Sequence, residues 1–233
     1  MREKLFLAIC FVMLFGFALG ASGGGGFFYL NRAVDNDAAF AVAKEKNFLP
    51  IKSKRMIAMR ISGFGTINYF LRLGGVFTLG YWDTEGPWKT MWSDTGGVGL
   101  GDMSIAVMPE LYYQFKKINI AAGLGVGGGV FVTYIDDAFG DNDGDRQFYA
   151  FLNPDMSIGY QLTEKFAVQA GIGWHLPFAG QNGKYWYYIV RLKKEHPFEP
   201  KEIGGFYFRV GVIFGKLYEK SPKPVLTERT DLK

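Results

Sequence analysis

The sequence predicts an all-β fold: an antiparallel up-and-down β-barrel of about eight strands with one short N-terminal helix. Aromatic residues make up 17% of the chain and 32 residues are glycines, a combination typical of many strands and turns. Apolar side chains alternate with polar or small ones over stretches far longer than the roughly five or six residues of an ordinary soluble strand. A tilted strand of about 9 to 11 residues already crosses a bilayer, so length and alternation together favour a closed barrel.

Residues 1–20 read as a secretory signal peptide. Arg2 and Lys4 precede an uncharged apolar run from Leu5 to Leu19, and small residues follow at once. An uncleaved membrane anchor is the alternative, but a run of about 15 apolar residues is short for a spanning helix. We expect cleavage after Gly20 or Ala21.

The only cysteine, Cys10, lies within this signal peptide, so the mature chain has no thiol. That excludes a disulfide framework and a thiolate metal site after cleavage. Removing residues 1–20 lowers the formal net charge from +4 to about +3. No dense basic patch accompanies this mild excess, so nucleic acid is not an expected partner.

A glycine-rich segment and a short helix are expected over residues 21–54. The segment "DNDAAFAVAKEKN" (Asp35 to Asn47) begins with acidic residues suited to a helix start, contains alanines, and stops before Pro50. We expect this helix to pack on the barrel or to enter its lumen.

The barrel itself is expected over residues 55–216, followed by a polar C-terminal tail over 217–233. The expected strands are Arg55 to Phe64, Ile67 to Trp82, Asp102 to Phe115, Ile118 to Tyr134, Gln147 to Gln161, Phe166 to Leu176, Lys184 to Lys193 and Phe206 to Gly215. A shorter candidate, Phe27 to Arg32, would make nine, which single-chain bacterial barrels avoid. With Arg55 first, both termini would fall at the end that carries the long loops, opposite to the usual arrangement. Either this list is wrong by one strand, or the barrel is not a standard one.

The strand from Ile118 to Tyr134 contains a glycine spacing that imitates a dinucleotide-binding motif. Such a motif needs its glycine turn to open a helix, whereas here the period of two runs through the glycines. One side of the strand is therefore bare, which suits close approach of another element. The residues expected to face the lumen are Gly123, Gly125, Gly127, Gly129, His175 and Arg209.

Turns and aromatic residues add to the barrel pattern. Lys116 to Lys117 and Thr163 to Lys165 are tight, whereas Asp83 to Thr95 and Asp136 to Asp145 are long. Short turns at one end and long loops at the other are typical of an outer-membrane barrel. Aromatic girdles are expected from pairs near strand ends: Tyr81 and Trp82, Trp88 and Trp92, Tyr112 and Tyr113, and the run Tyr185 to Tyr188.

From Arg55 to Phe214 the pattern of alternating strands resembles the small outer-membrane β-barrel proteins of Gram-negative-type bacteria. That resemblance implies an outer-membrane location, a lipid bilayer as partner, and a structural or narrow-pore, small-molecule passage role. A secreted or periplasmic lipocalin-like barrel with an apolar ligand cavity is the alternative. Separately, "GGGGFFYL" (Gly23 to Leu30) and "GFGTINYFLRLGG" (Gly63 to Gly75) are similar to uncharacterised exported glycine-rich proteins of thermophilic bacteria.

No catalytic, cofactor or metal site is expected. His175 would need a nearby serine for hydrolysis, and Ser157 is the one candidate, without a spacing that brings them together. The acidic loop Asp136 to Asp145 does not match a calcium loop, because Ala150 falls where the bidentate glutamate belongs. A solvated loop is expected there, with weak calcium binding as the alternative.

Overall fold

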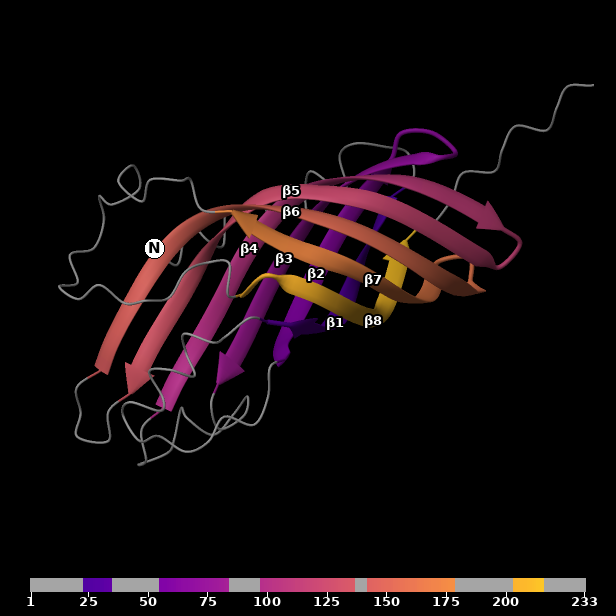
Figure 1. The fold of residues 1–233 in the computed structure, drawn as a ribbon. Coiled ribbons are helices and arrows are strands. Elements are labelled where there is room, and N and C mark those ends of the chain that lie inside the picture. The colour runs from indigo at the N-terminus through magenta and orange to yellow at the C-terminus, as the bar shows by residue number, and fades with distance from the viewer. Residues whose placement is uncertain (1–22, 35–54, 84–96, 137–141, 179–202, 216–233) are drawn as a thin grey trace, which may run out of the picture.

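The computed structural model describes residues 23–34, 55–83, 97–136, 142–178 and 203–215. Eight antiparallel strands make up this part of the chain: β1 (Gly23–Ala33), β2 (Arg55–Thr66), β3 (Leu71–Asp83), β4 (Gly97–Phe115), β5 (Ile118–Asp136), β6 (Asn142–Thr163), β7 (Phe166–Phe178) and β8 (Gly205–Gly215). Each strand pairs with the next, and β8 returns to β1, so the sheet is a closed up-and-down barrel, as the sequence predicts (Figure 1). Within the described residues, no helix is long and apolar enough to cross a membrane.

The first strand, Gly23–Ala33, contains the shorter candidate strand Phe27 to Arg32 and precedes the strand that starts at Arg55. Its glycine half carries no side chains and hence no visible alternation. Gly23 pairs with Gly65, and Gly24 pairs with Gly215, so the start of β1 and the end of β8 meet at the end of the barrel that carries the short turns. Both ends of the barrel sheet therefore lie at the short-turn end, which corrects the expected topology. The expected strand Lys184 to Lys193 and the expected helix Asp35 to Asn47 lie outside the described residues.

The β2–β3 connection also differs from the expectation, because Ile67–Phe70 form a turn rather than the start of a strand. The side-chain oxygen of Asn68 accepts hydrogen bonds from the backbone N–H groups of Phe70 (3.0 Å) and Leu71 (2.8 Å). Such a local side-chain bond stabilises a turn in place of the strand ladder. The β4–β5 turn places Lys116 at φ 54°, the left-handed region.

Strand length is uneven around the barrel. The strands β4, β5 and β6 have 19, 19 and 22 residues, whereas β1 and β8 have 11 each. The excess length lies at the long-loop end, where these three strands run beyond their neighbours (Figure 1). In the described part of β7, the last residue, Phe178, pairs with Ala150 of β6.

The two faces of the sheet differ sharply in polarity. On β7 the outward positions are Phe166, Val168, Ala170, Ile172, Trp174, Leu176 and Phe178, while the inward ones include Gln169, Gly171, Gly173 and His175. The other strands repeat this division. Apart from Arg55 at the long-loop end of β2, no outward strand position with a described side chain carries a charge.

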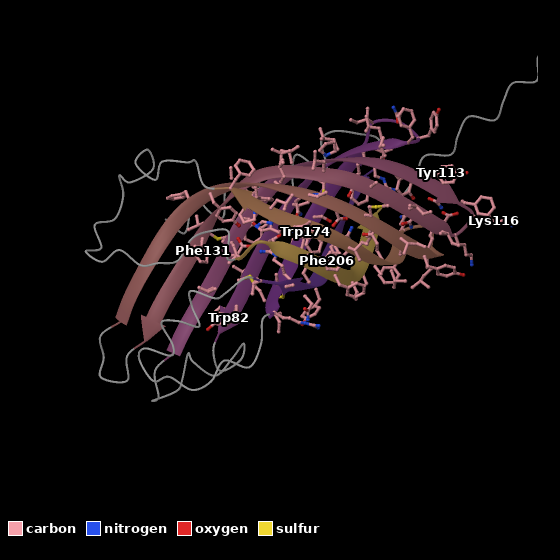
Figure 2. The ribbon with its side chains drawn as sticks, viewed as in Figure 1. Trp82, Tyr113, Lys116, Phe131, Trp174 and Phe206 are labelled. Carbon is pink, nitrogen blue, oxygen red and sulfur yellow. The ribbon has the colours of Figure 1, made fainter. Side chains whose placement is uncertain are left out.

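Exposed aromatic side chains gather toward both ends of this apolar surface. Figure 2 shows Tyr113 beside Lys116 at the short-turn end, and Trp174 with Phe206 on the outer wall, their ring centroids 6.3 Å apart. Trp82 and Tyr112, expected in the girdles, are instead buried inside, because neighbours in a strand face opposite sides. Trp88, Trp92 and the run 185–188 lie outside the described residues.

Candidate functional site

The lumen holds a cluster of charged side chains around Asp155 of β6. Arg209 of β8 donates from Nη2 to Oδ1 at 2.6 Å and from Nε to Oδ2 at 3.0 Å. Arg60 of β2 and the Tyr207 hydroxyl donate to the same carboxylate at 3.2 and 2.5 Å. We call Arg60, Asp155, Tyr207 and Arg209 the Asp155 cluster. It joins strands from opposite parts of the barrel through charge-assisted hydrogen bonds, the strong kind.

Glycines of β7 make room for this cluster. A Cβ atom at Gly171 would lie 3.0 Å from Arg209 Nε, and one at Gly173 would meet the Tyr207 hydroxyl and the Pro154 carbonyl. Side chains of β8 can therefore lie flat across β7 and reach β6. Asn153 extends the network: with its amide oxygen toward Arg60 Nη2 and its nitrogen toward the Trp174 carbonyl, both distances are 2.9 Å.

A second layer closes the short-turn end of the lumen. The guanidinium of Arg72 is stacked on Tyr112, 3.2 Å from the ring centre, and lies 4.5 Å from the centre of the Phe64 ring. The Tyr112 hydroxyl donates to Gln114 at 2.6 Å, and the Gln114 amide donates to Gln161 at 2.7 Å. Planar stacking of this kind is available to arginine and not to lysine. We call Phe64, Arg72 and Tyr112 the Arg72 stack.

A third layer occupies the long-loop half. Arg32 is fully buried and donates to Asp102 at 2.8 Å and to the Ile203 carbonyl at 3.3 Å. The Tyr149 hydroxyl donates to the other oxygen of Asp102 and lies 3.3 Å from Nε2 of His175. Trp82 and Phe131 are also buried in this half (Figure 2). The lumen is thus crossed by packed side chains at three levels.

The residues expected to face the lumen lie as follows. His175 contacts Tyr149 and Phe151, with the Phe151 ring centroid 4.6 Å away, and Arg209 belongs to the Asp155 cluster. The four glycines share the side of β5 on which Ala121 and Phe131 are buried. Added Cβ atoms would meet Met108 and Glu110 at Gly123, Asn153 at Gly125, the Ile105 carbonyl at Gly127, and the Tyr149 ring at Gly129. Among the described residues, the elements that approach this bare face are the neighbouring strands β4 and β6.

The serine–histidine pairing is not formed. Ser157 pairs with Gly171, four residues from His175 along β7, which is about 13 Å at roughly 3.3 Å per residue. Residues 137–141 of the acidic loop lie outside the described part, and the side chains of 142–147 are not described, so weak calcium binding stays a prediction. The described residues contain no group of three or more metal-ligating side chains.

Most of the lumen charges were not predicted as a site. Arg32, Arg60 and Arg72 come from strands whose alternation is less regular, and Asp102, Glu110 and Asp155 stand on the polar side of well-predicted strands. A signal was present, because a charge on the inward side of a small barrel must be paired. Identifying each partner requires the register and the closure of the sheet.

Comparison with known proteins adds only remote similarity. No protein-family model matches the chain, and no curated protein matches it significantly. The attachment invasion locus protein Ail of Yersinia pestis, solved with the heparin analogue sucrose octasulfate, is 11% identical at a TM-score of 0.47, over 83% of this chain and 96% of Ail. Neisserial surface protein A is 13% identical at 0.45, over 83% and 95% of the two chains. The N-terminal barrel domain of Pseudomonas aeruginosa OprF is 12% identical at 0.39, over 84% and 98%.

These three proteins are outer-membrane barrels of eight strands. The sequence identities and the TM-scores are both low, so these proteins are only remotely similar to this chain. The resemblance of Gly23 to Leu30 and Gly63 to Gly75 to exported glycine-rich proteins is not shown by these comparisons and stays a prediction.

Proposed function

We propose that the mature chain is an outer-membrane protein whose barrel spans the bilayer and has a structural role, closed to solutes. The observation that carries this proposal is the division of polarity across one closed sheet. Outward strand positions are apolar, and charged side chains are turned inward, where carboxylates meet guanidinium groups. A water-soluble protein instead buries apolar side chains and exposes charged ones to water.

The outer surface matches a bilayer in extent. The shorter strands have 11 to 13 residues. At about 3.3 Å per residue and a tilt of about 40°, they rise roughly 28 to 33 Å, close to the hydrocarbon thickness of about 30 Å. In water, soluble monomers tolerate apolar patches of only about 300 to 600 Å². A continuous belt around the whole barrel is far larger.

The lipocalin-like alternative needs the reverse orientation. Its apolar side chains would line an internal cavity, and its glycines would face solvent. In the described strands Ile105, Val126 and Ile158 point outward, whereas Gly171 and Gly173 face the lumen beside charged or polar side chains. These orientations favour the membrane-spanning barrel over an apolar ligand cavity in this part of the barrel.

A structural role is favoured over passage because packed side chains cross the described part of the lumen. The three layers of buried side chains leave a small cavity of about 30 Å³ between the Asp155 cluster and the Arg72 stack. Passage requires a continuous aqueous path, and barrels of eight strands ordinarily have interiors filled by side chains. The ion pairs of Asp155 with Arg60 and Arg209 instead link strands β2, β6 and β8 inside the barrel and stabilise it.

Two measurements test the proposal. Expressed cells are fractionated, and the membrane pellet is washed with alkaline carbonate and then with detergent; we expect release by detergent only. Purified protein is then placed in planar bilayers, where we expect no stable single-channel steps. Release by carbonate would overturn the membrane-spanning barrel. Retention together with steady conductance would overturn the closed structural role and leave the membrane location standing.

A further inference from the structure

The described part of the lumen contains a cavity whose wall is rich in hydrogen-bond donors. It measures about 30 Å³ and lies where the Asp155 cluster faces the Arg72 stack. Its polar lining consists of Arg60, Ser62, Arg72, Glu110, Gln169 and Arg209, and apolar side chains that include Val76 close the remainder.

Among the described residues, the charges around this cavity do not cancel. Arg60, Arg72 and Arg209 contribute three positive charges, whereas Glu110 and the adjacent Asp155 contribute two negative ones. Asp155 is already engaged by Arg209 through two hydrogen bonds and by Arg60 through a third. One positive charge is left over in a region away from water, where an uncompensated charge is costly.

One buried donor at the wall has no hydrogen-bond partner within the described structure. Arg60 is 97% buried, since its exposed fraction is 3%, and its Nε has no hydrogen-bond partner there. The oxygen of Gln169 accepts from Arg209 at 2.7 Å, so the N–H groups of the amide are what Gln169 has left to offer. An acceptor that carries one negative charge would satisfy both the donors and the charge balance.

We propose that this cavity binds a single small monovalent anion, with chloride as the physiological candidate. The surplus of one positive charge matches a monovalent ion, whereas sulfate carries two negative charges. Guanidinium and amide N–H groups would hold the ion, and Val76 and neighbouring apolar side chains would shield it from water. The inference concerns the lumen alone and goes beyond the structural role proposed above, because the ion would be held rather than conducted.

Halide-dependent stability tests the proposal in solution. The purified full chain in detergent is unfolded by heat in sodium chloride, sodium bromide or sodium sulfate at equal ionic strength. We expect a saturable rise in Tm with chloride and with bromide, as mass action requires for a ligand that binds only the folded state, and no such rise with sulfate. Equal effects of all three salts would overturn the proposal, because screening alone would then account for them.

Variants at the cavity wall test whether the chloride-dependent rise in Tm comes from this cavity. Val76→Leu adds one methylene at the cavity wall without changing any charge, and we expect it to abolish the chloride-dependent rise in Tm. Val126→Leu is the matched control, because Val126 lies on the outward face of β5; it should keep the full rise. If Val76→Leu does not fold, Ser62→Ala, which removes one donor, should raise the chloride concentration needed for half the effect several-fold. A full, unshifted chloride effect in a folded variant of the cavity would place the ion elsewhere and overturn the proposal.

Crystals grown in sodium bromide give an independent test by anomalous scattering. We expect one internal peak bounded by Arg60, Arg72 and Gln169. An internal site without an anomalous peak would identify water and overturn the proposal.

Discussion

Arg209 of β8 and Asp155 of β6 are joined by two hydrogen bonds, at 2.6 and 3.0 Å, although β7 separates their strands. The pair crosses β7 at Gly171, where the absence of a side chain leaves the space. This contact ties three consecutive strands together from the inside, at a level where their outer side is apolar. It shows how a small barrel can keep its charges off its apolar outer face and still pair them.

Removing the carboxylate charge should destabilise the barrel strongly. In Asp155→Asn, Arg60 and Arg209 would remain buried without their shared counter-charge, which typically costs about 3–5 kcal/mol. The measurement is urea unfolding in lipid vesicles. Glu164→Gln, in the exposed β6–β7 turn, is the matched carboxylate-to-amide control and should change stability by less than about 0.5 kcal/mol. Equal stability of the two variants would contradict the importance of the Asp155 cluster.

The glycines of β7 should not tolerate even a methyl group. In Gly173→Ala, the new Cβ would meet the Tyr207 hydroxyl and come within 2.6 Å of the Pro154 carbonyl. Overpacking of this kind costs about 1–3 kcal/mol. Gly101→Ala is the control, since its nearest contact would be an ordinary 3.6 Å to Val132. Thermal unfolding in detergent compares the two, and a Gly173→Ala variant as stable as Gly101→Ala would show that Tyr207 can move aside.

The Arg72 stack should depend on the shape of the guanidinium as well as its charge. Arg72→Lys keeps the charge but loses planar stacking on Tyr112, so we expect a loss of about 1–2 kcal/mol. The reverse exchange in an exposed turn, Lys165→Arg, serves as control and should be nearly neutral. Equilibrium unfolding in urea measures both. Full stability of Arg72→Lys would mean that charge alone accounts for the role of Arg72.

The cost of a charge on the outer surface should vary with depth. Met156 and Leu162 are both exposed on the outward face of β6, but Leu162 lies next to the short β6–β7 turn. Met156→Lys should cost about 2–4 kcal/mol in vesicles, and Leu162→Lys about 0–1 kcal/mol. The free energies of unfolding of the two variants are compared by urea titration in lipid vesicles. Equal costs would indicate that the surface around Met156 is not in hydrocarbon.

Alternation predicted most of the strands that the structure describes, together with their faces. From Ile118 onward, β5 has the expected direction, and its bare glycine face lies inward beside Phe131. Two segments of the fold could not be predicted from the alternation of apolar and polar residues. β1 begins with Gly23–Gly26, which have no side chains to alternate, and Ile67–Phe70 look like strand but are drawn into a turn by Asn68.

The partners of the charged side chains in the lumen could not be predicted from the alternation pattern, for a different reason. Asp155 meets Arg209 because the register places Asp155 opposite Gly173 and Arg209 opposite Gly171 on the intervening strand β7, and nothing local in β6 or β8 encodes that meeting. Arg32 and Asp102 are 70 residues apart in sequence, and Arg60 and Asp155 are 95 apart. Only the requirement that inward charges be paired could be predicted, and the pairs themselves are a property of the closed sheet.

The central claim, that the apolar outward face lies in hydrocarbon, is tested most directly by spin labels. The only cysteine, Cys10, precedes the predicted mature chain, so single cysteines at Ile105, Val126, Ile158 and Ile172 can be labelled without a background thiol. These positions lie on four successive strands and face outward. In lipid vesicles we predict collision with dissolved oxygen and protection from a water-soluble nickel complex at all four. Access of the nickel complex to these positions would contradict a membrane-spanning barrel.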